Sequence, residues 1–411
     1  MHSVTPWLAV IGIGENGLDG LNSAALRLIA GAELLVGGDR HLDKIPASLA
    51  TGERLRWAKP FDAAIQALLS RRGMPVAVLA SGDPMEYGVG ATLARHVPPE
   101  EMIVLPQPGA FSQAAATLGW PLQELKRLTV HGRPMDRVAL HLAPGQRLLI
   151  LSENGDTPQA LARWLHDRDW GLSTITVLEH LGGPEARMFT ACASDFPDRR
   201  FADLNTIAVQ CSPATPARIL PRLAGLPDGT FHHDGQLTKR VVRAATLASL
   251  APMPGELLWD VGAGCGSIGI EWMRGAEGAA AIAIERSADR CRLIALNAAE
   301  LGVPDLAIIE GQAAEHLDGL PPPDAIFIGG GLESALVETL WDLLKPGGRL
   351  VANAVTVEGE AVLFATHARF GGELTRIALS HAENLASHHL WRSSVPVTQL
   401  ATHKPTQARR A

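Results

Sequence analysis

Hydrophobic residues in the first half of the chain fall into short β-branched runs, and stretches with helical spacing separate these runs. The first four runs end in turn residues and predict buried strands at Trp7–Gly14, Glu33–Gly38, Pro75–Gly82 and Met102–Gly109. Helices are predicted between them, at Asn22–Ala30 and Phe61–Arg71. Because strands and helices alternate, the pattern predicts a mainly parallel sheet with both faces covered.

A second set of runs predicts a second α/β lobe. Its strands are expected at Arg127–Gly132, Arg147–Glu153, Ser173–Gly182 and Leu204–Cys211. Beyond them, Ser212–Gly229 is rich in proline and polar residues, which is typical of a linker. We therefore expect a two-lobed α/β domain over residues 1–212 and a linker over residues 213–230.

The rest of the chain predicts one more α/β domain. Five strands are expected at Leu257–Val261, Ala279–Glu285, Leu306–Glu310, Asp324–Ile328 and Arg349–Ala354. Helices are expected at Thr238–Leu250, from Ser267, and at Ala288–Leu301 and Glu333–Leu344. The segments Leu374–Ser380 and His389–Val397 read as antiparallel strands. This order predicts a Rossmann-like domain over residues 231–398 and a flexible tail over residues 399–411.

Composition narrows the class of protein. The chain has 411 residues, of which 46% are hydrophobic and 19% charged, the balance of a multidomain globular enzyme. Its net charge of −7 argues against nucleic acid as a partner, because phosphate binding needs a basic face. The four cysteines have no C-x-x-C spacing, so neither a metal site nor a disulfide framework is expected. No apolar run approaches the length of a membrane span, and we expect a soluble cytoplasmic protein.

A glycine-rich loop follows the first strand of the last domain and reads Gly262-Ala263-Gly264-Cys265-Gly266. The dinucleotide fingerprint needs a third glycine where this chain has Ser267. An isolated G-x-G-x-G fits a packing turn equally well. Two carboxylates add to it: Asp260, which we expect to face a cationic ligand group, and Glu285, which ends the next strand where ribose hydroxyls are bound. The combination favours S-adenosylmethionine (SAM) over NAD.

Five segments of the last domain resemble the precorrin-decarboxylating methyltransferase domain of cobalamin biosynthesis, which has the class I SAM-dependent methyltransferase fold. They read DGQLTKRVVRAATLASL, LLWDVGAGCGSIGIEW, AIAIERS, PDAIFIGGG and LKPGGRLVANAVT, between about Phe231 and Thr356. The resemblance implies cofactor contacts at Thr238, Gly262 to Gly266, Glu285 and Ala313. It departs at Gln312, where the family usually has an acidic residue; the glutamine carbonyl can still accept from the adenine amino group.

The first half resembles a different SAM-binding family, the tetrapyrrole methylases, over nearly all of residues 5–211. The segments that carry this resemblance are VIGIGENGLDGLNSAALRLI, LASGDPMEYGVGATL, HGR and LSENGDTPQALA. It implies that SAM is held in a cleft between two lobes, by Gly12, Ser81, Gly82, Asp83, Gly109 and Ala110. The frequent G-x-G-P-G of the family is Gly12-Ile13-Gly14-Glu15-Asn16 here, which leaves the role of Glu15 open.

The two resemblances together imply a bifunctional methyltransferase of the corrin pathway with two SAM sites, one per domain. They imply methylation of a tetrapyrrole at meso carbons 5 and 15 and loss of carbon dioxide from a ring acetate. By analogy, the C-terminal domain carries the decarboxylation and carbon 15, and the N-terminal domain carries carbon 5. A homo-oligomer is expected. Three alternatives stay open: another acceptor at the same two sites, an NAD-dependent oxidoreductase, and a SAM-sensing module without activity.

Few dedicated catalytic side chains are expected, because methyl transfer depends mainly on positioning. The substrate carries carboxylates, so we expect cations near it: Arg133, and Lys239 with Arg243, which lie four residues apart on one helix face. The remaining candidates are Tyr87 as a cleft residue, and His232 and His233 as proton donors to the macrocycle. Packing explains Tyr87 equally well, and a surface loop explains the histidine pair.

Overall fold

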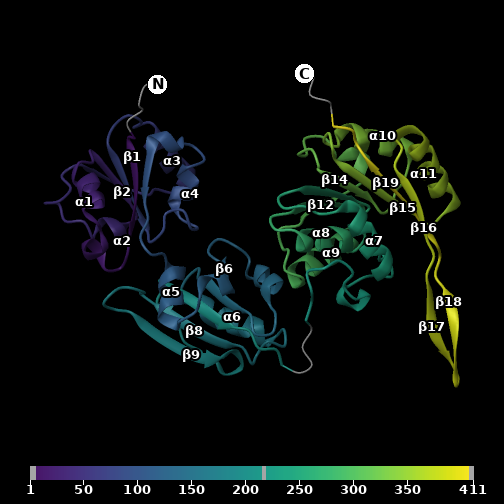
Figure 1. Ribbon diagram of the computed structural model, residues 1–411, viewed down its shortest axis with the longest axis horizontal. Coiled ribbons are helices and arrows are strands. Elements are labelled where there is room, and N and C mark those ends of the chain that lie inside the picture. The colour runs from purple at the N-terminus through teal and green to yellow at the C-terminus, as the bar shows by residue number, and fades with distance from the viewer. Residues whose placement is uncertain (1–5, 215–218, 407–411) are drawn as a thin grey trace. The chain divides into compact units, whose positions relative to one another are not determined.

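The structure is a computed structural model, and it describes residues 6–214 and 219–406 (Figure 1). The chain divides into two compact units. The first contains residues 1–133 and 141–218, and the second contains residues 134–140 and 219–411. In the described residues, no helix is long and apolar enough to cross a membrane.

The first lobe of the first unit is built on a parallel five-stranded sheet in the order β3-β2-β4-β1-β5. Its strands are β1 (Leu8–Ile13), β2 (Leu34–Gly37), β3 (Glu53–Arg56), β4 (Val76–Ser81) and β5 (Met102–Leu105). Its helices are α1 (Ser23–Ala30), α2 (Asp39–Leu42), α3 (Phe61–Leu69) and α4 (Val89–Leu93). The predicted parallel sheet is confirmed. Strand β3 was not predicted, because this edge strand is largely exposed and rich in charged residues.

The second lobe has a mixed five-stranded sheet in the order β6-β7-β10-β8-β9. Its strands are β6 (Leu125–Thr129), β7 (Arg147–Leu151), β8 (Thr174–Glu179), β9 (Arg187–Cys192) and β10 (Asn205–Gln210), with helices α5 (Ala110–Leu118) and α6 (Thr157–His166). Strands β6 and β7 are parallel, and the other pairs are antiparallel. The lobe is therefore α/β as predicted, and β9 is an additional, largely exposed edge strand.

The second unit contains a seven-stranded sheet in the order β13-β12-β11-β14-β15-β19-β16. The strands are β11 (Leu257–Val261), β12 (Ala280–Glu285), β13 (Ala307–Glu310), β14 (Ala325–Ile328), β15 (Arg349–Ala354), β16 (Glu373–Ile377) and β19 (Val397–His403). The helices are α7 (Arg240–Leu250), α8 (Ser267–Gly275), α9 (Ala288–Glu300), α10 (Ser334–Leu343) and α11 (Val357–Phe370). Strands β11 to β15 run parallel, and β19 is antiparallel to both of its neighbours.

This sheet positions a site at one of its edges. The chain leaves β11 toward β12 on one side and later returns to β14 on the other, so the strand order reverses there. Consecutive residues of β11 point to opposite faces: Leu258 joins one buried apolar cluster and Trp259 the other. With both faces packed, a ligand has access at the carboxyl ends of the strands, where the order reverses.

The predicted tail over residues 399–411 is wrong in its first part. Gln399 to His403 belong to β19, inside the sheet between β15 and β16, and Gln399 is only 3% exposed. Residues 407–411 lie outside the described part of the chain. The predicted strand His389–Val397 is also divided, because β17 (Ser380–Leu385) and β18 (His388–Ser393) form a separate two-stranded ribbon that projects from the unit (Figure 1).

The predicted linker over residues 213–230 is shorter than expected, because its second part packs on the second unit. Arg274, which is 2% exposed, donates hydrogen bonds to the carbonyls of Leu220 (3.3 Å) and Pro221 (3.1 Å). The N–H of Leu226 donates to Glu271 (3.0 Å). Residues 215–218 lie outside the described part of the chain, so only the segment around them is left as a connection.

Candidate functional site

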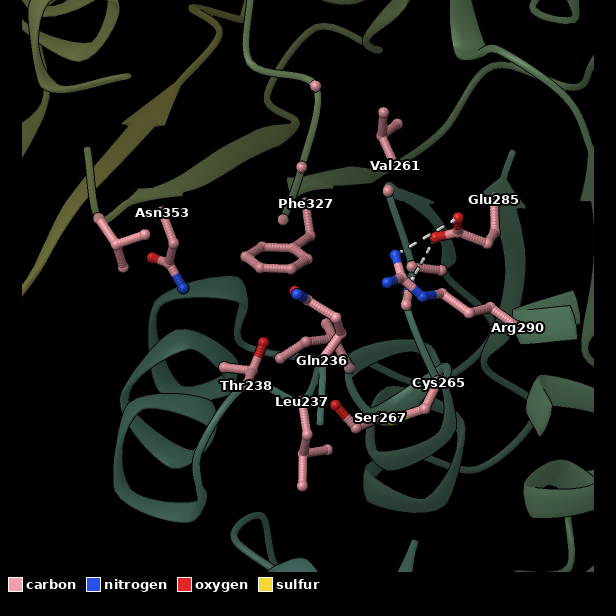
Figure 2. Close-up of a pocket in the computed structure, with 18 of the residues that line it drawn as sticks. Gln236, Leu237, Thr238, Val261, Cys265, Ser267, Glu285, Arg290, Phe327 and Asn353 are labelled. Atoms are coloured by element: carbon pink, nitrogen blue, oxygen red, sulfur yellow. Dashed lines mark hydrogen bonds and ion pairs between the residues drawn. The ribbon is translucent and has the colours of Figure 1, made fainter. Parts of the chain in front are cut away.

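A cavity of about 840 Å³ lies at the carboxyl ends of the strands in the second unit (Figure 2). The glycine-rich loop after β11, Glu285 at the end of β12, and Gln312 with Ala313 after β13 line one side. Residues at the ends of β14 and β15, among them Phe327 and Asn353, line the other side. A cavity of this volume accommodates a ligand of the size of a nucleoside cofactor.

The glycines of the loop have different tasks. A Cβ on Gly262 would lie 2.7–2.9 Å from the backbone of Gly330, and the residue has φ +68°, so only glycine fits. Gly264 has φ +61°, and a Cβ there would make only an ordinary contact, 3.5 Å from the carbonyl oxygen of Gln236, which also lines the cavity. Gly266, which precedes the first residue of α8, packs on Ile294 of α9 and does not line the cavity. A ligand can therefore approach the backbone closely at Gly264.

Glu285 is positioned by the same loop. Its Oε2 accepts a hydrogen bond from the N–H of Gly264 (2.9 Å) and its Oε1 from the N–H of Ser287 (3.1 Å). Arg290 lies 4.0 Å from the carboxylate. Each carboxylate oxygen has a second lone pair for a ligand hydroxyl. The loop, this carboxylate and Gln312 together fit a nucleoside such as that of SAM.

Asp260 does not face a ligand, contrary to the sequence-based expectation. It is fully buried behind the loop, and its Oδ2 accepts from the N–H of Gly269 in α8 (2.9 Å). Its Oδ1 has no hydrogen-bond partner among the described residues. Burial raises the pKa of this carboxyl to about 7, and the nearby negative charge of Glu285 adds to that effect. Asp260 therefore supports the loop from behind.

Arg243 is not available to a substrate, so that prediction is wrong. Its side chain is fully buried and donates to Glu271 (2.7 Å) and Asp228 (3.1 Å) as well as to the carbonyl of Thr238. Thr238 and Lys239 do line the cavity. The sequence spacing predicted that Lys239 and Arg243 share one helix face. In the structure Lys239 precedes the first turn of α7, whereas Arg243 lies within α7 and contacts Glu271 of α8.

The two histidine candidates do not line this cavity. The Nε2 of His232 lies 3.0 Å from Glu300, and the Nδ1 of His233 accepts from the N–H of Gly235 (3.0 Å). The surface-loop interpretation therefore holds for both. In contrast, sequence reasoning missed Asn353 and Phe327. The only signal for Asn353 is a polar residue near the end of a buried strand, in the segment VANAVT.

A second cavity, of about 990 Å³, lies in the first unit. It is lined by most of the predicted residues of this half: Ser81, Gly82, Asp83, Tyr87, Gly109, Ala110 and Arg133. Gly12 is the exception. A Cβ there would overlap with the carbonyl oxygen of Gly82, so Gly12 permits close contact between β1 and the loop after β4 instead of contacting a ligand.

Ser81 in this cavity contacts one cationic and one neutral side chain. Its hydroxyl contacts Arg40 Nη2 (2.8 Å) and His41 Nε2 (2.9 Å). Burial, with the adjacent positive charges, lowers the pKa of His41 to about 4, so its ring is neutral at pH 7. Burial alone would raise the pKa of Glu15, but its hydrogen bond with Lys44 and the charge of Arg40 lower it. Glu15 is therefore an ion-pair partner at the cavity wall.

Tyr87 meets both descriptions that the sequence left open. It lines the cavity and is 49% exposed. Its ring also packs edge-on against Phe111, with 6.0 Å between the ring centroids, and its hydroxyl donates to the carbonyl of Arg127 (3.3 Å). The Arg133 guanidinium lies 5.5 Å from the centroid of the Tyr87 ring. The pair forms one polar and aromatic wall of the cavity.

Comparisons with known proteins match two different families to two parts of the chain. Residues 8–197 match the family of tetrapyrrole (corrin/porphyrin) methylases, and residues 229–404 match the precorrin methyltransferase domain family. The chain is 50% identical, over 397 residues, to a precorrin-6Y C(5,15)-methyltransferase [decarboxylating] of Sinorhizobium sp. That alignment covers 96% of each of the two chains.

Two shorter relatives each match less than half of the chain. A cobalt-precorrin-7 C(5)-methyltransferase of Salmonella typhimurium is 30% identical over 183 residues, which cover 44% of this chain and 88% of the relative. A probable cobalt-precorrin-6B C(15)-methyltransferase (decarboxylating) of Pyrobaculum aerophilum is 32% identical over 181 residues, covering 42% of this chain and 92% of the relative. In these relatives the two named activities belong to separate proteins.

Proposed function

Because the chain belongs to the precorrin-6Y C(5,15)-methyltransferase (decarboxylating) family, we propose that it methylates precorrin-6Y at carbons 5 and 15. The proposed reaction also removes the carboxyl group of a ring acetate and gives precorrin-8x in cobalamin biosynthesis. One observation carries the proposal: each unit has its own cavity, which is lined by residues predicted to contact a cofactor and is large enough for one. An enzyme that transfers two methyl groups at different carbons has a use for both.

The proposal includes two SAM sites, one per domain. When bound, SAM supplies an electrophilic methyl group on a sulfonium. In the second domain Glu285 and the backbone of Gly264 hold the nucleoside, with further contacts from residues that line the same cavity: Thr238, Gly262, Ala263, Cys265, Gln312 and Ala313. In the first domain we assign the contacts to Ser81, Gly82, Asp83, Gly109 and Ala110, all of which line its cavity.

We assign carbon 5 to the first domain and the decarboxylation, with carbon 15, to the second. The two shorter relatives support a separation of the two activities, since a C(5)-methyltransferase and a decarboxylating C(15)-methyltransferase each match a part of the chain of single-domain size. The assignment of each activity to one domain follows the family that each half matches. Lys239, which lines the cavity of the second unit, and Arg133, which lines the cavity of the first unit, are proposed to hold peripheral carboxylates of the substrate.

The side chains have little proton chemistry to perform in methyl transfer. An enamine carbon of a reduced tetrapyrrole is already nucleophilic, and holding it in line with the methyl group can supply roughly 7–11 kcal/mol of the barrier. The described lining of the cavity in the second unit fits this view, because neither His232 nor His233 belongs to it. The task of the residues is to bind, to orient and to exclude water.

We also propose that the chain forms a homo-oligomer and works in the cytoplasm. A two-stranded ribbon is marginally stable alone, and β17–β18 exposes Trp391 (75%) and Leu390 (39%). Contact with a second copy would cover these side chains. Light scattering of the purified chain tests the assembly, and fractionation of producing cells tests the location.

The activity is tested by incubating the purified chain with precorrin-6Y and SAM. We expect a product with two added methyl groups and one equivalent of carbon dioxide. A product with one methyl group, or retention of the acetate carboxyl, contradicts the bifunctional assignment. Separate assay of the two domains tests the division of labour, and decarboxylation by the first domain contradicts it.

A further inference from the structure

The cavity of the second unit has two halves with different linings. Carboxylate, amide and backbone groups line the half beside β11, β12 and β13, as described above. The half beside β14, β15, β19 and β16 is mainly apolar, and among its described lining residues between 327 and 397 the only charged one is Glu333. Its apolar members are Phe327, Leu336, Val355, Ile377, Leu379, Val395 and Val397. This half suits a large conjugated ring.

Asn353 is one of two polar side chains without charge in this apolar half, with Ser394. Figure 2 shows Asn353 and Glu285 on opposite sides of the cavity, with Phe327 between them. A neutral amide so placed lies across the cavity from Glu285, the carboxylate expected to bind the ribose. It is therefore positioned to contact an acceptor molecule instead of the cofactor.

A buried hydrogen-bond network holds this amide. Asn353 Nδ2 donates to Thr246 Oγ1 (2.9 Å), and Gln399 Nε2 donates to Asn353 Oδ1 (2.9 Å). Gln399 Nε2 also donates to Thr246 Oγ1 (3.0 Å), and Ser249 donates to Gln399 Oε1 (3.0 Å). Thr246 and Gln399 are fully or almost fully buried. The network joins α7, β15 and β19 beneath the cavity.

The network permits one orientation of the Asn353 amide. Thr246 donates its only hydroxyl hydrogen to the carbonyl of Val242 (2.8 Å), so it can only accept from Asn353. The reverse orientation would also place two donors, Asn353 Nδ2 and Gln399 Nε2, against each other. With one amide hydrogen given to Thr246, the second has no partner in the described part of the chain and is available to a ligand in the cavity.

We propose that Asn353 binds the acceptor substrate and donates its second N–H to the acetate carboxylate that leaves as carbon dioxide. This inference rests on the proposed function. In the decarboxylation the bond between the acetate methylene and the carboxyl carbon breaks, and its electron pair enters the conjugated macrocycle. Carbon dioxide leaves, and the methylene carbon then takes a proton from water, so that the acetate becomes a methyl group.

A neutral donor suits this step better than a cation. An arginine or lysine paired with the carboxylate would stabilise the charged ground state, and this stabilisation would be lost as the charge moves into the ring. A single amide N–H fixes the direction of the scissile bond with less stabilisation of that charge. The apolar side chains around it keep water from the carboxylate, which also favours loss of the charge.

The test uses the full chain with Asn353→Leu and Asn353→Asp. The first removes the donor, and the second keeps the size but places acceptors toward the carboxylate. With precorrin-6Y and SAM, we expect kcat for carbon dioxide release to fall at least 10-fold in both. The dissociation constant for SAM at the site of the second domain should stay within two-fold of the value for the unsubstituted chain. Thr366→Val, which removes a buried hydrogen bond in α11 away from the cavity lining, serves as the control and should release carbon dioxide normally.

The outcomes separate this inference from the proposed function. If the unsubstituted chain releases no carbon dioxide from precorrin-6Y, the proposed function fails. If it does, and both Asn353 variants match it, the inference fails. A loss of activity with an equal loss of SAM affinity also overturns the inference, because Asn353 would then serve the cofactor site or the fold. A thermal unfolding scan of each variant verifies that the variant is still folded at the temperature of the assay.

Discussion

Glu285 accepts a hydrogen bond from the N–H of Gly264, so the end of β12 and the loop after β11 are joined at the cavity wall by a distance of 2.9 Å. The Glu285 side chain is almost fully buried. The hydrogen bond from Gly264 fixes the orientation of its carboxylate and therefore the direction of the remaining lone pairs. The conformation of the loop and the position of the ligand-binding carboxylate therefore depend on each other.

Substitution Glu285→Gln should weaken SAM binding to the second domain about 10-fold to 100-fold, because a hydrogen bond to a charged acceptor is worth about 1.5–3 kcal/mol. Titration calorimetry of the full chain measures it, and the site in the first domain is expected to keep its affinity. Glu310→Gln, at the end of β13 and outside the cavity lining, is the matched control. Equal effects at both positions would contradict the assigned role.

Substitution Gly262→Ala should abolish SAM binding in the second domain. The new Cβ has no room beside Gly330, and the positive φ of the residue strains any other side chain, at a cost of roughly 1–3 kcal/mol. Gly229→Ala is the control, since a Cβ there meets no atom within 4 Å. Normal SAM binding by Gly262→Ala would show that the loop is more adaptable than its contacts indicate.

Asp260 should make the second domain less stable as the pH rises. Its pKa is raised to about 7 in the folded chain, above its usual value of 3.8, so the folded state binds the extra proton. The contribution is full below about pH 4 and is lost as the pH rises through 7, by on the order of 2–3 kcal/mol between pH 5 and pH 8. Urea unfolding of the chain and of Asp260→Asn at both pH values measures this. The variant should lack that part of the pH dependence, and identical pH profiles would contradict it.

Arg243 and Lys239 should differ in what their loss affects. Arg243→Met leaves Glu271 as a buried charge with one partner fewer and should destabilise the second domain by about 3–5 kcal/mol. Lys239→Met changes an exposed side chain, so its unfolding free energy should stay within about 0.5 kcal/mol, while the KM for the tetrapyrrole rises. Urea unfolding and steady-state kinetics distinguish the two. A raised KM for Arg243→Met without loss of stability would restore the original prediction for that residue.

The elements that sequence alone could place are those whose ends are marked locally. Strands β11 and β15 begin and end at the predicted residues. Glu256 and Gly262 bound the apolar run of β11, and Gly347 and Gly348 mark the start of β15. Strand β19 was missed because it contains Gln399, a polar residue whose partners Thr246 and Asn353 come from distant segments. No local pattern shows that such a residue will be satisfied inside a sheet.

The candidate site shows the same limit. The glycine-rich loop and Glu285 were predictable, since their geometry follows from a turn and the strand that comes after it. Arg243 was misjudged because helical spacing says which residues share a face, and not that Glu271 and Asp228 meet that face. Asp260 was misjudged because its direction depends on the packing of α8 behind the loop.

The contacts of Arg274 bear on how the two halves can be produced as separate fragments. A C-terminal fragment that starts at Ala224 would lack the carbonyls of Leu220 and Pro221 and leave the interior guanidinium with the carbonyl of Leu301. Its Nε already has no partner in the described part of the chain. Such a fragment would be prone to aggregate whatever its catalytic competence, so the cut belongs upstream of Leu220.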